Sequence, residues 1–92
     1  MQSDYESKRN KYDICAEILE LCLNKPQRHT SIVYRTNINH HLLLAYLEIL
    51  EKAKLLERTE LGAKTTKKGQ KWVEKFREIN LSSPLFLSNE GK

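Results

Sequence analysis

The chain has 92 residues, which is enough for one small domain and too few for two separate cores. Hydrophobic residues make up 39% and charged residues 30%, with 3 Gly and 2 Pro, which excludes disordered, collagen-like and disulfide-rich classes. No apolar run approaches the roughly 20 residues that span a bilayer, and the polar residues 1–11 lack the apolar core of a signal peptide. We therefore expect a cytoplasmic protein that does not enter a membrane.

The positive charge of the chain is unevenly distributed. The 16 Lys and Arg residues against 12 Asp and Glu give a formal net charge of +4. Residues 21–47 contain three basic residues and no acid, and residues 61–73 contain four basic residues and no acid. Such clustering favours a surface that binds a polyanion, nucleic acid above all. Lysines that only solvate helices remain the alternative.

The first predicted helix begins at Ser7 or Asn10 and ends at Asn24, because apolar residues recur at helical spacing between them. Cys15 and Cys22 lie on the same face of this helix. At a rise of about 1.5 Å per residue their Cα atoms are roughly 10 Å apart, whereas a disulfide needs less than about 7 Å. We therefore interpret both cysteines as small buried hydrophobic residues.

A short second helix is predicted from Thr30 or Ser31 to Thr36, with Thr30 as its N-cap. A sharp turn follows it. Asn37 tolerates the left-handed backbone conformation that such a turn needs, and Asn39 is a good N-cap for the next helix. Two helices joined in this way form a helix-turn-helix.

The third helix is predicted from His40 to about Lys54, with apolar residues at helical spacing. Two short strand candidates follow, residues 55–58 and 63–65, around a turn at 59–62 with a glycine near its tip. A helix-turn-helix followed by a small hairpin, or wing, is the plan of a winged helix. The predicted fold class is therefore mainly α with a small β-hairpin, a winged helix-turn-helix.

The fourth helix is predicted to begin after Thr66 as its N-cap and to end between Asn80 and Ser83, before Pro84. One side of this helix is apolar and consists of Gly69, Trp72, Val73, Phe76 and Ile79. The large members of this set are interpreted as core residues. A seam between two copies of the chain is the alternative.

The chain divides into an N-terminal extension (residues 1–9), the winged helix-turn-helix domain (10–80) and an apolar C-terminal tail (81–92). The large apolar residues of the tail are Leu81, Leu85, Phe86 and Leu87. Such residues are costly to leave in water. We therefore expect the tail to dock on its own domain or across a dimer.

Several short segments stand in the order and spacing of a known group of proteins; they are residues 12–14, 30–39 (TSIVYRTNIN), 55–57 and 65–69 (TTKKG). Over about residues 10–80 the chain resembles the small archaeal winged-helix DNA-binding proteins, the ArnR-like family that includes basic chromatin-associated dimers. The resemblance implies a homodimer that binds double-stranded DNA. It also implies a transcription regulator or a chromatin-associated protein, located in the nucleoid.

The chain departs from these proteins at two places. Lys54 stands where similar proteins have a glycine before the first wing strand, and Leu42, Leu44 and Ala45 stand where they have polar or basic residues. Together with Ile49 these residues make the third helix apolar nearly all round. A recognition helix normally presents donors and acceptors to base edges. Either this helix reads little sequence, or protein covers part of its outer face.

The start of the third helix is the first candidate DNA surface, because N-terminal residues of a recognition helix meet the DNA. There Asn39 can pair with adenine, and His40 and His41 can bond to phosphate or to a base edge. Arg28 and Arg35, next to or within the second helix, are candidate phosphate contacts. A helix cap and two solvated histidines are the alternative for the first three.

Further basic residues flank the wing and open the fourth helix. Arg58 and Lys64 stand on the two strand candidates, where winged helices touch the DNA backbone or the minor groove. Lys67 and Lys68 open the fourth helix and are candidate phosphate contacts, with a solvated face as the alternative.

No catalytic site, metal site or cofactor is predicted. The chain has no Gly-rich phosphate loop and no nucleophile with a recognisable base. The adjacent His40 and His41 point about 100° apart on a helix, so they cannot easily share one ion. Two functions remain: a homodimeric double-stranded DNA-binding protein, and a protein-interaction module that uses the leucine-rich third helix and the apolar tail.

Overall fold

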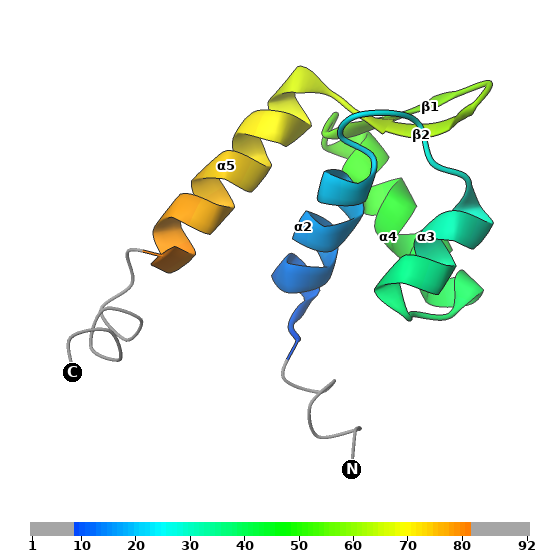
Figure 1. The fold of residues 1–92 in the computed structure, drawn as a ribbon, viewed down its shortest axis with the longest axis horizontal. Helices are drawn as coiled ribbons and strands as arrows, with labels where there is room; N and C mark the ends of the chain where they lie inside the picture. Colours follow the sequence, from blue (N-terminus) through cyan, green and yellow to red (C-terminus); the bar gives the residue numbers. More distant parts are fainter. Residues whose placement is uncertain (1–8, 82–92) are drawn as a thin grey trace, which may run out of the picture.

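The computed structural model describes residues 9–81 of the chain. The helices α2 (Lys11–Leu21), α3 (His29–Thr36) and α4 (His40–Lys52) are followed by the strands β1 (Leu56–Thr59) and β2 (Gly62–Thr65) and by α5 (Lys67–Leu81). In Figure 1, α2, α3 and α4 gather below the hairpin, and α5 runs away from the hairpin on the other side of α2. The predicted fold class, mainly α with one small hairpin, is confirmed.

The second of the two predicted starts of the first helix is correct. Asn10 Oδ1 accepts a hydrogen bond from Asp13 N at 2.9 Å, and Asp13 Oδ2 accepts one from Asn10 N at 3.1 Å. This reciprocal capping box satisfies two backbone donors at the start of α2. The helix ends at Leu21, so the predicted end at Asn24 is wrong.

Strand β2 holds the C-terminal carbonyl groups of α2, which explains the early end of this helix. Thr65 Oγ1 donates to Leu19 O at 2.6 Å, and Thr65 N donates to Cys22 O at 3.0 Å. Lys64 Nζ donates to Leu23 O at 3.2 Å. The hairpin therefore satisfies carbonyl groups that have no partner at a helix end. Lys64 also places a positive charge at the negative end of the helix dipole.

Helix α3 begins at His29, and the predicted N-cap at Thr30 is wrong. Arg28 takes the N-cap position, and its side chain makes no capping hydrogen bond to a described residue. Gln27, just before it, pairs with Ala63 of β2 through two backbone hydrogen bonds of 2.9 and 2.8 Å. Because the chain leaves this pairing at Arg28, the helix starts directly afterwards and Thr30 falls within its first turn.

The turn between α3 and α4 is as predicted. Asn37 adopts the left-handed conformation, with φ 61°, at the end of α3. Asn39 is the N-cap of α4, and its Oδ1 accepts a hydrogen bond from Leu42 N at 2.7 Å. These two asparagines fix the angle at which α4 leaves α3.

The end of α4 differs slightly from the prediction. The helix ends at Lys52, and Leu55 N then donates to Leu50 O at 2.9 Å. Because Leu55 is still bonded to α4, β1 begins one residue later than predicted. Lys54 lies in the left-handed region with φ 67°. This conformation costs a residue with a side chain about 1–2 kcal/mol.

The wing is an antiparallel pair of β1 and β2. The segment before α3 pairs with β2 through Gln27 and Ala63. Gly62 has φ 135°, and a Cβ at this position would lie 2.5 Å from the backbone oxygen of Gln27. Both the backbone conformation and the close approach therefore require glycine. This single residue lets the wing pair with the start of α3.

The core lies between α2, α3, α4 and the inner side of the wing. Its buried side chains include Ile18, Leu19, Ile32, Leu43, Leu47, Leu56 and Ala63. Cys15 and Cys22 are buried and form no disulfide with each other, as predicted. Burial raises the pKa of the Cys22 thiol to about 11, so this thiol stays protonated and packs as a small apolar group.

Helix α5 has the predicted cap and the predicted end. Thr66 Oγ1 accepts a hydrogen bond from Gly69 N at 3.0 Å, and the helix ends at Leu81. Arg77 joins α5 to α2, because its Nε and Nη2 donate to the two carboxylate oxygens of Glu20, both at 2.7 Å. Such a bidentate pair fixes orientation as well as contact.

The apolar side of α5 is only partly buried. Val73 is buried, whereas Trp72 is partly buried and stacks on Phe76 with 5.3 Å between ring centroids. Ile79 is 63% exposed, so its interpretation as a core residue is wrong. The predicted docking of the tail, with Leu85 and Phe86, lies outside the described residues.

Candidate nucleic-acid interface

The start of α4 presents three of the predicted contact residues to solvent. Asn39, His40 and His41 are all exposed. The Oδ1 atom of Asn39 is already used as the helix cap, which leaves its Nδ2 amide as the group able to donate to a DNA acceptor. His40 faces α3, where its ring meets the ring of His29 with 5.8 Å between centroids. The first turns of the two helices of the helix-turn-helix therefore meet through two imidazoles.

Two arginines lie beside His29, one member of this pair. Arg28, His29 and Arg58 line a hollow of about 260 Å³ under the wing, together with residues of the wing turn. We call Arg28, His29, His40 and Arg58 the wing-side cluster. It brings together three predicted contact residues, and it adds His29, which the sequence analysis missed. His29 stands beside Arg28 in an acid-free segment, but the misplaced start of α3 hid its position facing α4.

The electrostatics of the wing-side cluster are set by the close approach of its members. Burial lowers the pKa of His29, the positive charges of Arg58 and His40 lower it further, and Glu51 acts in the opposite direction. Glu51 of α4 also forms an ion pair with Arg58. Arg28 and Arg58 supply the permanent positive charge of the cluster, and Glu51 offsets part of it.

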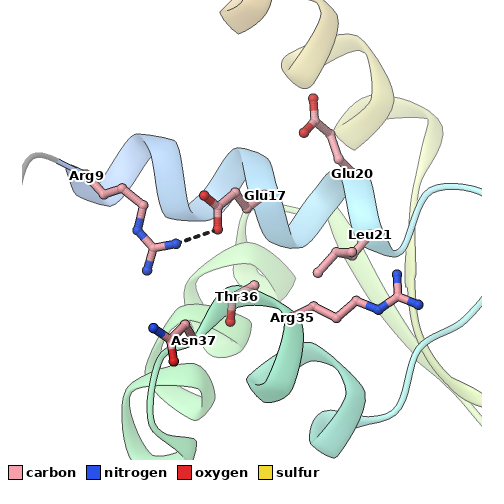
Figure 2. Close-up of a pocket in the computed structure, with 7 residues that line it drawn as sticks. All are labelled: Arg9, Glu17, Glu20, Leu21, Arg35, Thr36 and Asn37. Atoms are coloured by element: carbon pink, nitrogen blue, oxygen red, sulfur yellow. Dashed lines mark hydrogen bonds and ion pairs between the residues drawn. The ribbon is translucent and has the colours of Figure 1, made fainter. Parts of the chain in front are cut away.

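Arg35 lies in a different part of the molecule from the wing-side cluster. It lines a pocket of about 460 Å³ between α2 and the end of α3, and two acids, Glu17 and Glu20, line the same pocket. Figure 2 shows Arg35 and Arg9 at opposite ends of this pocket, with Arg9 Nη1 donating to Glu17 Oε1 at 2.8 Å. The structure does not bring Arg35 together with Arg28 or Arg58.

The remaining predicted lysines have different surroundings. Lys64 is partly buried and is bonded to the end of α2, as described above. Lys67 and Lys68 are exposed in the first turn of α5, immediately after the wing. These two lysines can reach a polyanion without breaking a contact seen among the described residues.

Three large apolar side chains of α4 are exposed. Leu42 is 42% exposed, Leu44 is 39% exposed and Ile49 is 58% exposed. None of these side chains can donate or accept a hydrogen bond at a base edge. The same helix therefore starts at a basic cluster and continues with exposed apolar side chains beside the ion pair of Glu48 and Lys52.

Comparison with known proteins agrees with this architecture. A family model described as winged helix-turn-helix matches residues 8–83, which covers every element described above. No curated protein matches the chain. Among residues 9–81 no helix is long and apolar enough to cross a membrane, and no three His, Cys, Asp or Glu residues gather as metal ligands. The chain belongs to the winged helix-turn-helix family.

Proposed function

We propose that the protein binds double-stranded DNA, with α4 at the major groove and basic residues of α3, the wing and α5 on phosphates. The observation that supports the proposal is the wing-side cluster, which places two arginines and two histidines beside the exposed start of α4. In a winged helix-turn-helix these are the parts that meet a duplex. Lys67 and Lys68 extend the basic surface beyond the wing.

The finer part of the proposal is a transcription regulator or a chromatin-associated protein of the nucleoid. It is supported by the resemblance to the small archaeal ArnR-like proteins. A homodimer is part of the same proposal, and the residues offered for its seam on α5 are Trp72, Phe76 and Ile79.

The test is fluorescence anisotropy of a labelled random-sequence duplex, titrated with the protein at several salt concentrations. We expect binding that weakens steeply with salt, because each neutralised phosphate adds about 0.9 to the slope of log K against log salt. The variant Arg28→Glu should lower both the affinity and this slope.

The matched control is Lys75→Glu, in the second half of α5, the helix that runs away from the wing in Figure 1. It reverses the charge of one exposed lysine outside the proposed interface. We expect the affinity for the duplex to change less than twofold. An equal loss in the control and in the Arg28 variant would contradict the placement of the interface. Absence of binding at low salt would overturn the proposal itself.

A second candidate function is a protein-interaction module. It is favoured by one observation, the exposure of Leu42, Leu44 and Ile49 on α4. A partner that covers these residues would bind independently of salt, because apolar burial is not screened. The dependence of affinity on salt therefore separates the two functions: it is steep for a duplex and weak for a partner that covers these residues.

A further inference from the structure

We infer that His29 and His40, with Arg58 beside them, form a site for a backbone phosphate that takes up a proton when the protein binds DNA, so that affinity rises as pH falls. The inference rests on the proposed function and adds that DNA binding is coupled to the uptake of a proton. His29 is the new element, because no sequence pattern pointed to it.

The first step is the geometry of the two rings. His29 lies in the first turn of α3 and His40 in the first turn of α4, and their centroids are 5.8 Å apart. Both imidazoles therefore stand at the positive ends of helix dipoles, which favour an anion. The hollow under the wing opens beside His29 and gives a phosphate access to the site.

The second step is the set of charges around His29. From its own helix start comes Arg28, from β1 comes Arg58, and from α4 come His40 and Glu51. Glu60 of the wing turn lines the same hollow. Arg58 and His40 oppose protonation of His29 in the free protein, and Glu51, already paired with Arg58, offsets them only in part.

The third step is the effect of a phosphate in this hollow. Its negative charge lies beside the His29 ring, which lines the hollow, and favours the imidazolium form of His29, which reverses the balance of the free protein. Between the lower pKa of free His29 and its higher pKa in the complex, the complex holds more protons than the free protein. By linkage the affinity for DNA then rises as pH falls through this range, and uptake of one proton gives at most about tenfold per pH unit.

The experiment measures the Kd of the labelled duplex at about pH 8, 7 and 6 at constant ionic strength. We expect a roughly five- to tenfold gain in affinity across this range for the wild-type protein. The double variant His29→Gln/His40→Gln should show no more than a twofold change with pH. The control is His41→Gln, which should keep the wild-type change with pH even where its affinity differs.

A second measurement does not depend on the variants folding. The pKa of His29 is followed by NMR in the wild-type protein with and without duplex, and we expect it to rise in the complex. Duplex binding that does not change with pH, or a His29 pKa that does not move, would overturn the inference while leaving the proposed function intact. Absence of duplex binding at every pH would overturn both.

Discussion

The two edges of α4 differ in chemistry although they belong to the same helix. The edge toward α3 and the wing carries His40 and Glu51, which contact His29 and Arg58. The edge that holds Leu42 and Ile49 is apolar and exposed. Charge supplies affinity for any duplex, whereas base-edge contacts supply discrimination between sequences. Under the proposed function we expect the affinity for DNA to come mainly from the wing side and α4 to read few bases.

The largest effect is expected on stability, from a change that disrupts the pairing of the wing with the segment before α3. Gly62→Ala would place a Cβ against the backbone of Gln27 at a positive φ, and we expect a loss of about 2–4 kcal/mol in the free energy of unfolding. Thermal unfolding measures it, with a fall in Tm of about 10–20 °C.

The matched control for Gly62→Ala is Leu61→Ala, at the neighbouring exposed position of the wing turn. This change should stay within about 0.5 kcal/mol. A Gly62→Ala protein with the wild-type Tm would mean that the wing does not need its pairing with the segment before α3.

A smaller effect, a gain in duplex affinity, is expected from increasing the positive charge of the wing side. Glu51→Gln removes the acid that pairs with Arg58, so this guanidinium becomes free for a phosphate. We expect a gain of about three- to tenfold in duplex affinity at low salt, with a loss of less than about 1 kcal/mol in stability. Anisotropy and thermal unfolding measure the two quantities.

The control for Glu51→Gln is Glu74→Gln on α5, which changes the net charge equally at an exposed residue bonded to Gln70. It should alter affinity less than twofold. A similar gain in both variants would show that the affinity depends only on net charge and that Arg58 does not contact the duplex.

The smallest effect is expected on the apolar edge. Leu42→Gln/Ile49→Gln changes two exposed side chains that make no polar contact with a duplex, so affinity for the random-sequence duplex should change less than twofold. The same titration measures it. A loss of more than tenfold would move the main DNA contact to this edge and would remove the contrast between the two edges.

The order and type of the elements could be predicted from the sequence, because each depends on local signals. Asn39 and Thr66 cap their helices as predicted, Asn10 is one of the two predicted starts of the first helix, and Asn37 takes the left-handed turn. Leu43 and Leu47 stand at helical spacing in α4 and are core residues. Propensity and periodicity suffice where the cause lies within a few residues.

The errors arose where the cause lies far along the chain. The pairing of Gln27 with Ala63 decides where α3 begins, and it also turns His29 toward His40. The chain around Arg35 gives no sign that its side chain lies beside α2. A basic residue in a sequence shows charge, but its neighbours in space depend on contacts between segments that are distant in the sequence.

The bond between Thr65 and the end of α2 also constrains the order of events in synthesis. Thr65 and Leu19 are 46 residues apart, and Arg77 and Glu20 are 57 apart. Closing such long loops is entropically costly, and contacts of this range slow folding. The last turn of α2 emerges from the ribosome early but obtains its hydrogen-bond partners only after the wing has been made. We therefore expect the amide of Thr65, which donates to Cys22 O, to be among the last to become protected from hydrogen exchange.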